Sequence, residues 1–377
     1  MFETISGVGI YILPFLILLT ILVFVHEMGH YSVARWFGVT VETFSIGFGR
    51  AIYSWKDKSG TQWKIGWLPL GGYVKFLGDE DPSSVRKSEE KIILADGESL
   101  FQDQPLYARA AVVAAGPAAN FLFAIAILAI VFATVGQSFT PPVVDDVIPD
   151  TAASRAGLQS GDKIIRIDGQ SIERFEELQI IIATSPGISL EVLVEREGST
   201  LPMTIIPGSR TFTDRFENVQ ERGFLGVSRG GRAHVKHGPV AAVWYATRET
   251  YRLSVLTLKN VWRMIVGTRP ADELRGIIGI AQMSGQAAQM GFESILGLTV
   301  IISIGLGLIN LFPIPVLDGG HLVFYAYEAV FRKPLGEKAQ EFGFRIGLVL
   351  VITLMLFALW NDLVRLDVFE HLNRVFS

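Results

Sequence analysis

The sequence contains no cysteine, and this absence removes several kinds of chemistry at once. The chain can form no disulfide bond, it can bind no metal through a thiolate, and it has no cysteine nucleophile. Cysteine usage therefore leaves the redox compartment undetermined. Any metal that this chain holds must be bound through nitrogen or oxygen atoms.

Charge is also scarce in this chain. Only 19% of the 377 residues are charged, and 33 basic against 37 acidic residues give a formal net charge of -4. There is no basic excess of the kind that binds nucleic acid, so we expect no nucleic acid partner. Half of the residues are hydrophobic and the mean hydropathy is +0.39, which predicts a polytopic membrane protein.

Four apolar stretches are long enough to cross roughly 30 Å of hydrocarbon. They lie at about residues 9–34, 108–136, 294–316 and 341–361. The first is preceded by no basic region and no small-residue cleavage site, so we expect it to be retained as a membrane span rather than removed as a signal peptide. Four crossings leave both termini on the same side of the membrane.

The orientation of these spans follows from the basic residues near them. No lysine or arginine precedes the first span, whereas the loop after the third carries Arg332, Lys333, Lys338 and Arg345. The positive-inside rule then places both termini outside the cytoplasm and the loops 35–107 and 319–340 inside it. Loop 35–107 supports this only weakly, because acidic residues match its basic ones.

The first apolar stretch runs into His26-Glu27-Met28-Gly29-His30. The helical repeat of 3.6 residues places His26 and His30 on one face, where two imidazoles can bind one Zn²⁺ ion while Glu27 acts beside them. Ionisable residues inside a membrane span are costly and usually functional. The pattern therefore predicts a metalloprotease site within a membrane, with Glu27 as the catalytic base.

Two histidines leave a catalytic zinc one protein ligand short. The third apolar stretch ends at Pro313 and Pro315, which break the helix just ahead of Asp318. Irregular backbone at membrane depth is tolerated only where protein or a water-filled cavity surrounds it, so Asp318 is the best candidate for the third ligand. The alternatives are His321, three residues on, and Asp362, at the far end of the fourth span.

Residues 143–207 show a compact α/β pattern. Turn signals separate predicted strands at 143–148, 163–167, 189–196 and 201–206 and a short helix at about 175–184. This order, together with an Ala-Gly-Leu run that begins at Ala156, resembles a PDZ domain, which binds peptides by adding a strand to a sheet edge. A small sandwich that merely spaces the membrane segments is the alternative.

Two further segments have recognisable patterns. Residues 239–266 are predicted to form an amphipathic helix at the outer membrane interface, although packing against the membrane core is equally possible. Residues 61–68 and 72–77, joined through 69–71, are predicted to pair as a hairpin. Such a hairpin could hold an unwound substrate by backbone pairing, or it could lie at the interface without contacting substrate.

Five motifs together resemble the bacterial site-2 protease family, the RseP-type regulated intramembrane zinc metalloproteases. They lie at residues 26–30, 44–49, 69–75, 116–121 and 310–321, and the resemblance covers nearly the whole chain. It implies that His26, His30 and Asp318 bind zinc, that Glu27 is the base, and that Asn310 helps to hold the substrate or the developing oxyanion.

The resemblance also implies a membrane-reentrant β-loop, in which Gly71, Gly72 and Tyr73 would present the substrate. Two features depart from the family pattern. The best-studied relatives carry two tandem PDZ domains where this chain shows one, and the outer Gly-Pro-x-x-Ile-Ala signature reads Gly276-Ile277-Ile278-Gly279-Ile280-Ala281 here. The first departure puts in doubt whether a pair of PDZ domains screens substrates here. The second puts in doubt the outer gate that the family pattern implies near the third span.

The expected fold is a polytopic α-helical membrane protein with four transmembrane helices, a cytoplasmic membrane-associated β-hairpin and an inserted extracytoplasmic α/β PDZ domain. The expected divisions are an N-terminal membrane half, a PDZ domain, an extracytoplasmic linker with the amphipathic helix, and a C-terminal membrane half, at residues 1–140, 141–208, 209–293 and 294–377.

The family resemblance implies partners as well. Substrates would be transmembrane proteins such as anti-sigma factor-like proteins, and remnant signal peptides, after an upstream first-site protease has trimmed them outside. The enzyme would lie in the lipid bilayer of the bacterial inner membrane, with its active site toward the cytoplasm. Two rival classes are a metal transporter, which needs neither Glu27 nor a PDZ-like insert, and a catalytically silent PDZ scaffold, which would tolerate loss of Glu27 or Asp318.

Overall fold

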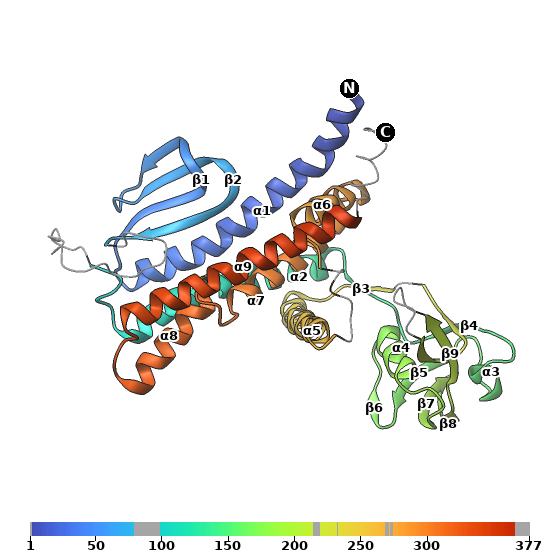
Figure 1. Ribbon diagram of the computed structural model, residues 1–377. Coiled ribbons are helices and arrows are strands. Elements are labelled where there is room, and N and C mark those ends of the chain that lie inside the picture. The colour runs from blue at the N-terminus through green and yellow to red at the C-terminus, as the bar shows by residue number, and fades with distance from the viewer. Residues whose placement is uncertain are drawn as a thin grey trace, which may run out of the picture. The chain divides into compact units, whose positions relative to one another are not determined.

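The computed structural model describes residues 2–78, 99–213, 219–231, 233–267, 271 and 274–365 (Figure 1). The chain divides into two compact units. We call them the helical unit, which comprises Met1–Ala129 and Val243–Ser377, and the strand-rich unit, Ile130–Ala242.

Within the described ranges, four helices are long and apolar enough to cross a membrane: α1 (Phe2–Trp36, of which Gly9–Trp36 qualifies), α2 (Leu106–Thr134), α7 (Phe292–Asn310) and α9 (Glu337–Arg365). They correspond to the four predicted spans. The third is shorter than the predicted 294–316, because α7 ends at Asn310. Pro313 lacks a backbone N–H and disfavours helical backbone in the residue before it, so the helix stops ahead of it.

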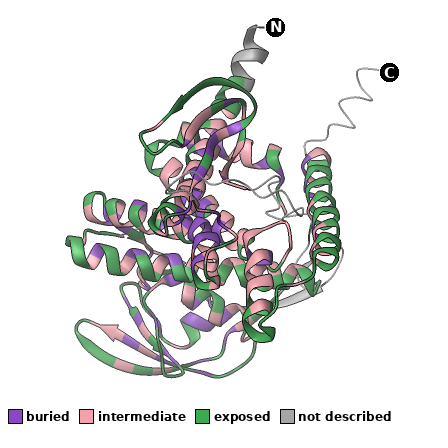
Figure 2. Cartoon of the chain, turned by 90° about the vertical axis from the view of Figure 1, so that its left-hand side faces the viewer, coloured by how far each residue is buried: buried purple, intermediate pink, exposed green. Residues whose placement is uncertain are grey.

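Much of the exposed surface of these long helices is apolar. On α9 the exposed side chains include Leu348, Val349, Met355, Leu356 and Trp360, and Figure 2 shows exposed positions along whole helix faces. Large contiguous apolar surfaces are rare on proteins that face water. This surface is therefore suited to contact with lipid.

The described part of the helical unit contains three further helices: α5 (Pro239–Ile265), α6 (Ile277–Met290) and α8 (Asp318–Phe331). Helix α5 matches the predicted amphipathic helix at 239–266, and its place at a membrane interface stays a prediction. Helix α6 packs against α1 and α7 through a small cluster of buried residues, Leu18, Leu22, Ala287 and Leu298.

A long β-ribbon lies beside α1 (Figure 1) and is formed by β1 (Val41–Lys56) and β2 (Gln62–Phe76). The predicted hairpin was wrong here, because residues 61–68 and 72–77 do not pair with each other but fall almost wholly in the single strand β2. The turn lies instead between β1 and β2, where the Asp57 carboxylate accepts hydrogen bonds from the backbone N–H groups of Ser59 and Thr61. An aspartate that caps its own turn in this way favours reversal at that point.

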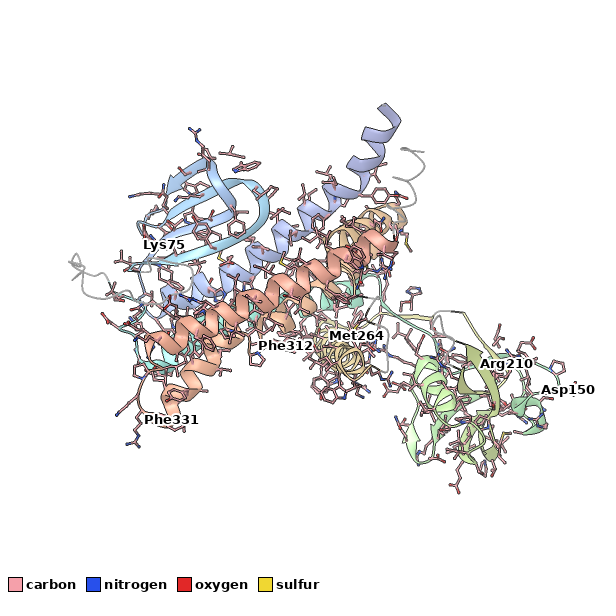
Figure 3. The ribbon with its side chains drawn as sticks, in the orientation of Figure 1. Lys75, Asp150, Arg210, Met264, Phe312 and Phe331 are labelled. Atoms are coloured by element: carbon pink, nitrogen blue, oxygen red, sulfur yellow. The ribbon has the colours of Figure 1, made fainter. Side chains whose placement is uncertain are left out.

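Strand β2 bends so that both of its ends lie beside β1. Phe44 of β1 pairs with Trp63 on one side and with Val74 on the other, and Lys56 pairs with Gln62. The second half of β1 and residues 72–76 of β2 have no second strand partner among the described residues, so these two segments are the free edges of the ribbon. Lys75, labelled in Figure 3, forms an ion pair with Glu42 at 2.8 Å across the strands.

The strand-rich unit contains the predicted α/β pattern. Its elements are β4 (Val144–Val147), α3 (Ala152–Arg155), β5 (Lys163–Ile167), β6 (Gln170–Ser171), α4 (Phe175–Ala183), β7 (Leu190–Arg196) and β8 (Ser199–Ile205). Four of the strands form a sheet in the order β6-β5-β7-β8. Each predicted strand and the helix is found within two residues of its predicted bounds. The core includes Ile164, Leu178, Val194 and Ile205.

This unit is larger than the predicted domain 141–208. Strand β11 (Val227–Arg229) pairs with β4, Leu225 lies in the core, and β12 (Ala233–Val235) pairs with β3 (Gln137–Phe139). A further pair, β9 (Gly208–Thr213) and β10 (Val219–Phe224), precedes them. The first part of the predicted linker 209–293 therefore belongs to the folded unit, because its short strands complete sheets begun before residue 148.

A buried ion pair connects two elements of the strand-rich unit. The Asp162 carboxylate is 1% exposed and accepts hydrogen bonds from the Arg196 guanidinium, at 2.7 Å to each oxygen, and from the Gln159 N–H at 2.8 Å. The hydrogen bonds from Arg196 lower the pKa of Asp162, although burial acts in the opposite direction. The pair joins β7 to the loop before β5.

Replacement of Asp162 by alanine should destabilise the strand-rich unit by roughly 2–3 kcal/mol, because charged hydrogen bonds in a buried position are lost. Hydrogen exchange of its amides in the full chain, corrected for intrinsic rates, measures this change. Because the folded pKa is lowered, the contribution of Asp162 is complete above its unfolded value of about 3.9 and disappears as the pH falls below it. Asp145→Ala, at an exposed nearby carboxylate, is the control, and equal effects of the two variants would contradict this assignment.

Candidate metal centre

Helices α1 and α2 approach each other closely beside the two histidines. Gly29 faces α2, and a Cβ at this position would overlap the backbone carbonyl of Ala115. Gly116 faces α1 in turn, and a Cβ there would overlap the imidazole of His30 and approach that of His26. The two glycines thus provide the space in which both imidazoles fit between the helices.

Asp318 reaches the site from the turn between α7 and α8. After Asn310 the chain turns through Pro313 and Pro315, and Asp318 is the first residue of α8. Gly319 and Gly320 pack directly on backbone carbonyls of residues 311, 312 and 314, where side chains would overlap them. This tight turn fixes the start of α8 and with it the position of the Asp318 carboxylate.

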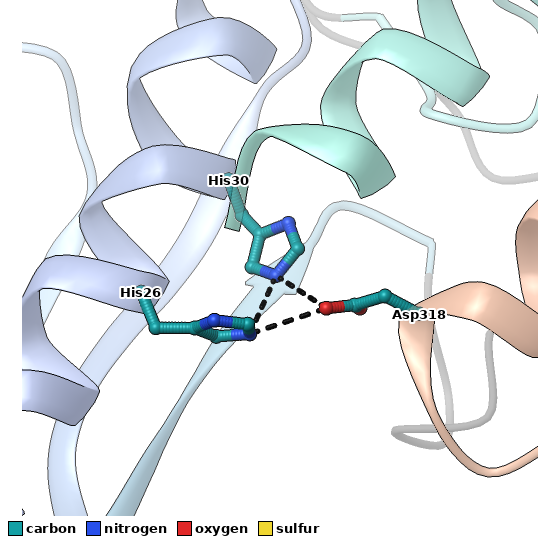
Figure 4. A group of neighbouring side chains, drawn as sticks. All are labelled: His26, His30 and Asp318. Atoms are coloured by element: carbon teal, nitrogen blue, oxygen red, sulfur yellow. Dashed lines mark hydrogen bonds and ion pairs between the residues drawn. The ribbon is translucent and has the colours of Figure 1, made fainter. Parts of the chain in front are cut away.

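Three ligand atoms converge in Figure 4. The Nε2 atoms of His26 and His30 are 3.2 Å apart, and Asp318 Oδ2 lies 3.2 Å from the first and 3.6 Å from the second. Three ligands at about 2.1 Å from a tetrahedral zinc ion lie about 3.4 Å from one another. Asp318 Oδ2 is also buried and accepts no well-aligned hydrogen bond from the part of the chain that the structure describes. The donor types and their spacing therefore fit a zinc ion.

Glu27 lies in the cavity that borders this cluster. The cavity has a volume of about 430 Å³ and is lined by the three ligand residues and, among others, by Glu27, Tyr73, Asn310 and His321. Val74, on the free edge of β2, lines the same cavity as Glu27. A carboxylate, a metal site and a free strand edge thus face one cavity.

The predicted substrate-presenting residues lie in β2 rather than in a loop, which corrects that prediction. A Cβ on Gly72 would lie 3.4 Å from the Cγ atom of Glu27, so this part of the strand passes directly over the catalytic candidate. Gly71 has φ +129° and approaches the Phe48 ring, while Tyr73 lines the cavity. Asn310, the last residue of α7, lines it as well.

His321 and Asp362, the two alternatives for the third ligand, have different surroundings from those of Asp318. His321 lines the cavity one turn after Asp318, and its ring packs against Phe344 with centroids 5.5 Å apart. Asp362 is buried and accepts hydrogen bonds from the N–H groups of Gly276 and Gly279, at 3.1 and 2.9 Å. Asp362 therefore caps the start of α6 and takes no part in the metal site.

Sequence reasoning missed the contribution of α2. His30 Nδ1 lies 2.9 Å from the Val112 carbonyl oxygen, and His26 Nδ1 lies 3.0 Å from the side-chain amide of Asn120. Val112, Gly116 and Asn120 follow at intervals of four, so they share one face of α2. The sequence feature that could have indicated this contribution is Asn120 itself, a lone amide side chain inside an apolar span.

Comparison with known proteins gives three findings. A family model described as "Peptidase family M50" matches residues 14–354. The chain is 43% identical over 359 residues to the "Putative zinc metalloprotease Atu1380" of Agrobacterium fabrum, covering 94% of this chain and 95% of that protein. It is 37% identical to the "Metalloprotease MmpA" of Caulobacter vibrioides, covering 98% of this chain and the whole of that protein.

Among solved structures, the PDZ domain of an SdrC-like protein from Listeria monocytogenes matches 24% of this chain and 88% of its own. Its sequence identity is 18% and the TM-score is 0.19.

The geometry predicts which residues the metal requires. Asp318→Ala should lose bound zinc, because a carboxylate ligand disappears, whereas His321→Ala and Asp362→Asn should retain about one zinc ion per chain. Metal content of each purified variant, measured by mass spectrometry, checks this. Loss of zinc from His321→Ala with retention in Asp318→Ala would show that His321, and not Asp318, is the third ligand.

Proposed function

The chain belongs to peptidase family M50, and we propose that this zinc metalloprotease hydrolyses peptide bonds within the transmembrane segments of single-pass membrane proteins. The observation that carries the proposal is the position of the metal centre. His26, His30 and Glu27 belong to an apolar helix of membrane-spanning length, and Asp318 follows another. Family membership also favours a protease over the metal transporter and the silent scaffold.

The chemistry of the site follows from its residues. A zinc ion held by His26, His30 and Asp318 would supply Lewis acidity toward a water molecule and the scissile carbonyl. Glu27, in the same cavity, accepts the proton of that water and returns it to the leaving amine. Asn310 lines the cavity and offers an amide that can donate to the substrate carbonyl as negative charge develops there.

Substrate presentation is assigned to the free edge of β2. A transmembrane helix satisfies its own peptide groups, so its backbone must unwind before a protease can reach it. Residues 72–76 form a strand edge whose first residue, Gly72, lies against Glu27, and an extended segment could pair with this edge while its scissile bond lies at the metal. The support for this assignment is the shared cavity of Tyr73, Glu27 and the ligand cluster.

We further assign the strand-rich unit to substrate selection. Its strand and helix order over residues 144–205 is the one from which a PDZ domain was predicted, and such a domain could exclude substrates whose outer domains are intact. Expected substrates are anti-sigma factor-like proteins and remnant signal peptides, trimmed first by another protease. The proposed location is the bacterial inner membrane, with the termini outside and the active site toward the cytoplasm.

Glu27→Gln should retain zinc and lower the rate of cleavage by about 10²–10⁴-fold, because the amide cannot accept the proton. The measurement is hydrolysis of a single-pass model substrate by the purified protein in detergent, with metal content determined in parallel. Glu341→Gln, which replaces an exposed carboxylate on α9, is the matched control. Cleavage by Glu27→Gln at the parent rate would refute the proposed role.

Excision of residues 141–231 should extend cleavage to substrates with intact outer domains. The design follows from the pairing of Phe139 with Ala233, which places the two cut ends on adjacent strands so that a short Gly-Ser turn can join them. Cleavage of a pre-trimmed substrate at the parent rate is the control for an intact helical unit. If the excised protein still failed to cleave the untrimmed substrate, the strand-rich unit would not be the part that excludes such substrates.

A further inference from the structure

Each histidine of the metal centre uses its two ring nitrogens differently. The Nε2 atoms of His26 and His30 face Asp318, whereas the Nδ1 atoms face α2. A ring nitrogen that binds a metal carries no proton, so in a neutral imidazole the proton resides on the other nitrogen and needs an acceptor. The partners of the two Nδ1 atoms therefore decide whether both Nε2 atoms are available to zinc.

His30 has a partner of the right kind. Its Nδ1 atom lies 2.9 Å from the Val112 carbonyl oxygen, which can only accept a hydrogen bond. The proton is therefore held on Nδ1, and the Nε2 lone pair of His30 points to the metal site.

The partner of His26 is Asn120, whose side chain is fully buried. Its amide nitrogen faces His26 Nδ1 at 3.0 Å, while its Oδ1 atom is buried and has no hydrogen-bond partner among the described residues. The oxygen and nitrogen of an amide have nearly the same shape, and a half-turn of the group exchanges them. Only the oxygen is compatible with a metal on His26 Nε2, because only the oxygen accepts the Nδ1 proton.

The backbone of Asn120 is anchored to α7. Ser303 of α7 donates a buried hydrogen bond of 2.8 Å to the Asn120 backbone carbonyl. Gly116, one turn earlier on α2, leaves room for both imidazoles. These two features place the Asn120 side chain behind His26.

We propose that Asn120 is a positioning residue of the metal centre, whose Oδ1 atom accepts the Nδ1 proton of His26 and so fixes the imidazole with Nε2 free for zinc. This role rests on the proposed zinc protease function. It makes the face of α2 that carries Val112 and Asn120 the support of both histidine ligands.

The test compares two replacements of similar size in the full-length protein purified in detergent. Asn120→Asp keeps an acceptor oxygen, and Asn120→Leu keeps the volume without any acceptor. Zinc affinity is measured by competition with a chelator in the Glu27→Gln background, where turnover plays no part. We expect Asn120→Leu to lose about 10- to 100-fold in zinc affinity and Asn120→Asp to stay close to the parent.

The control is Ser284→Ala, which removes the hydrogen bond from a buried serine to the Ile280 carbonyl on α6 but leaves Asn120 and the acceptor for His26 in place, and should bind zinc like the parent. Equal affinity of Asn120→Leu and the parent would overturn the proposal, and so would equal losses in Asn120→Leu and Asn120→Asp. If the parent itself bound no zinc, the proposed function would fail instead, so the two failures are distinguishable.

A second measurement does not depend on whether the Asn120 variants fold. In zinc-loaded protein labelled with ¹⁵N-histidine, nuclear magnetic resonance should show His26 Nδ1 protonated and hydrogen-bonded, with the signal assigned through loss in His26→Ala. A His26 Nδ1–H proton that exchanged with solvent as fast as that of an unbonded imidazole would overturn the proposal.

Discussion

The meeting of three ligand atoms in an apolar part of the molecule is the constraint on which the helical unit depends. Two imidazole nitrogens and one carboxylate oxygen lie within 3.6 Å of one another. Polar groups so close together are costly in an apolar environment unless a partner satisfies them. A divalent cation bound by nitrogen and oxygen is such a partner, and the glycines at 29, 116, 319 and 320 create the close backbone packing that the cluster requires.

The polar residues inside the apolar segments serve three different purposes. Asp318 faces the ligand cluster, Asn120 lies behind His26, and Asp362 caps α6 through Gly276 and Gly279. The general expectation that an ionisable residue in a membrane span is functional therefore identifies Asp318 but misleads for Asp362. Geometry separates them, because the Asp362 oxygens accept hydrogen bonds from two backbone N–H groups, whereas Asp318 Oδ2 faces the Nε2 atoms of both histidines.

The features of the structure that were predicted correctly follow from local patterns in the sequence. The i, i+4 spacing of His26 and His30, the break before Asp318 and the turns around β5 and β7 depend on neighbouring residues alone. The bending of β2 around β1, the completion of the strand-rich unit by residues 225–235 and the contacts of α2 with the histidines depend on pairing between distant segments. No local pattern distinguishes residues 61–68 and 72–77 as two strands of a hairpin from parts of one bent strand.

Bound zinc seen directly in the protein tests the central claim, that His26, His30 and Asp318 together form one metal centre. Anomalous diffraction at the zinc absorption edge, from crystals of the Glu27→Gln protein, locates the ion without reference to activity. The predicted result is one peak at about 2.0–2.2 Å from both Nε2 atoms and from an Asp318 oxygen. A peak bound by His321 in place of Asp318, or zinc only at other positions on the chain, would contradict the account.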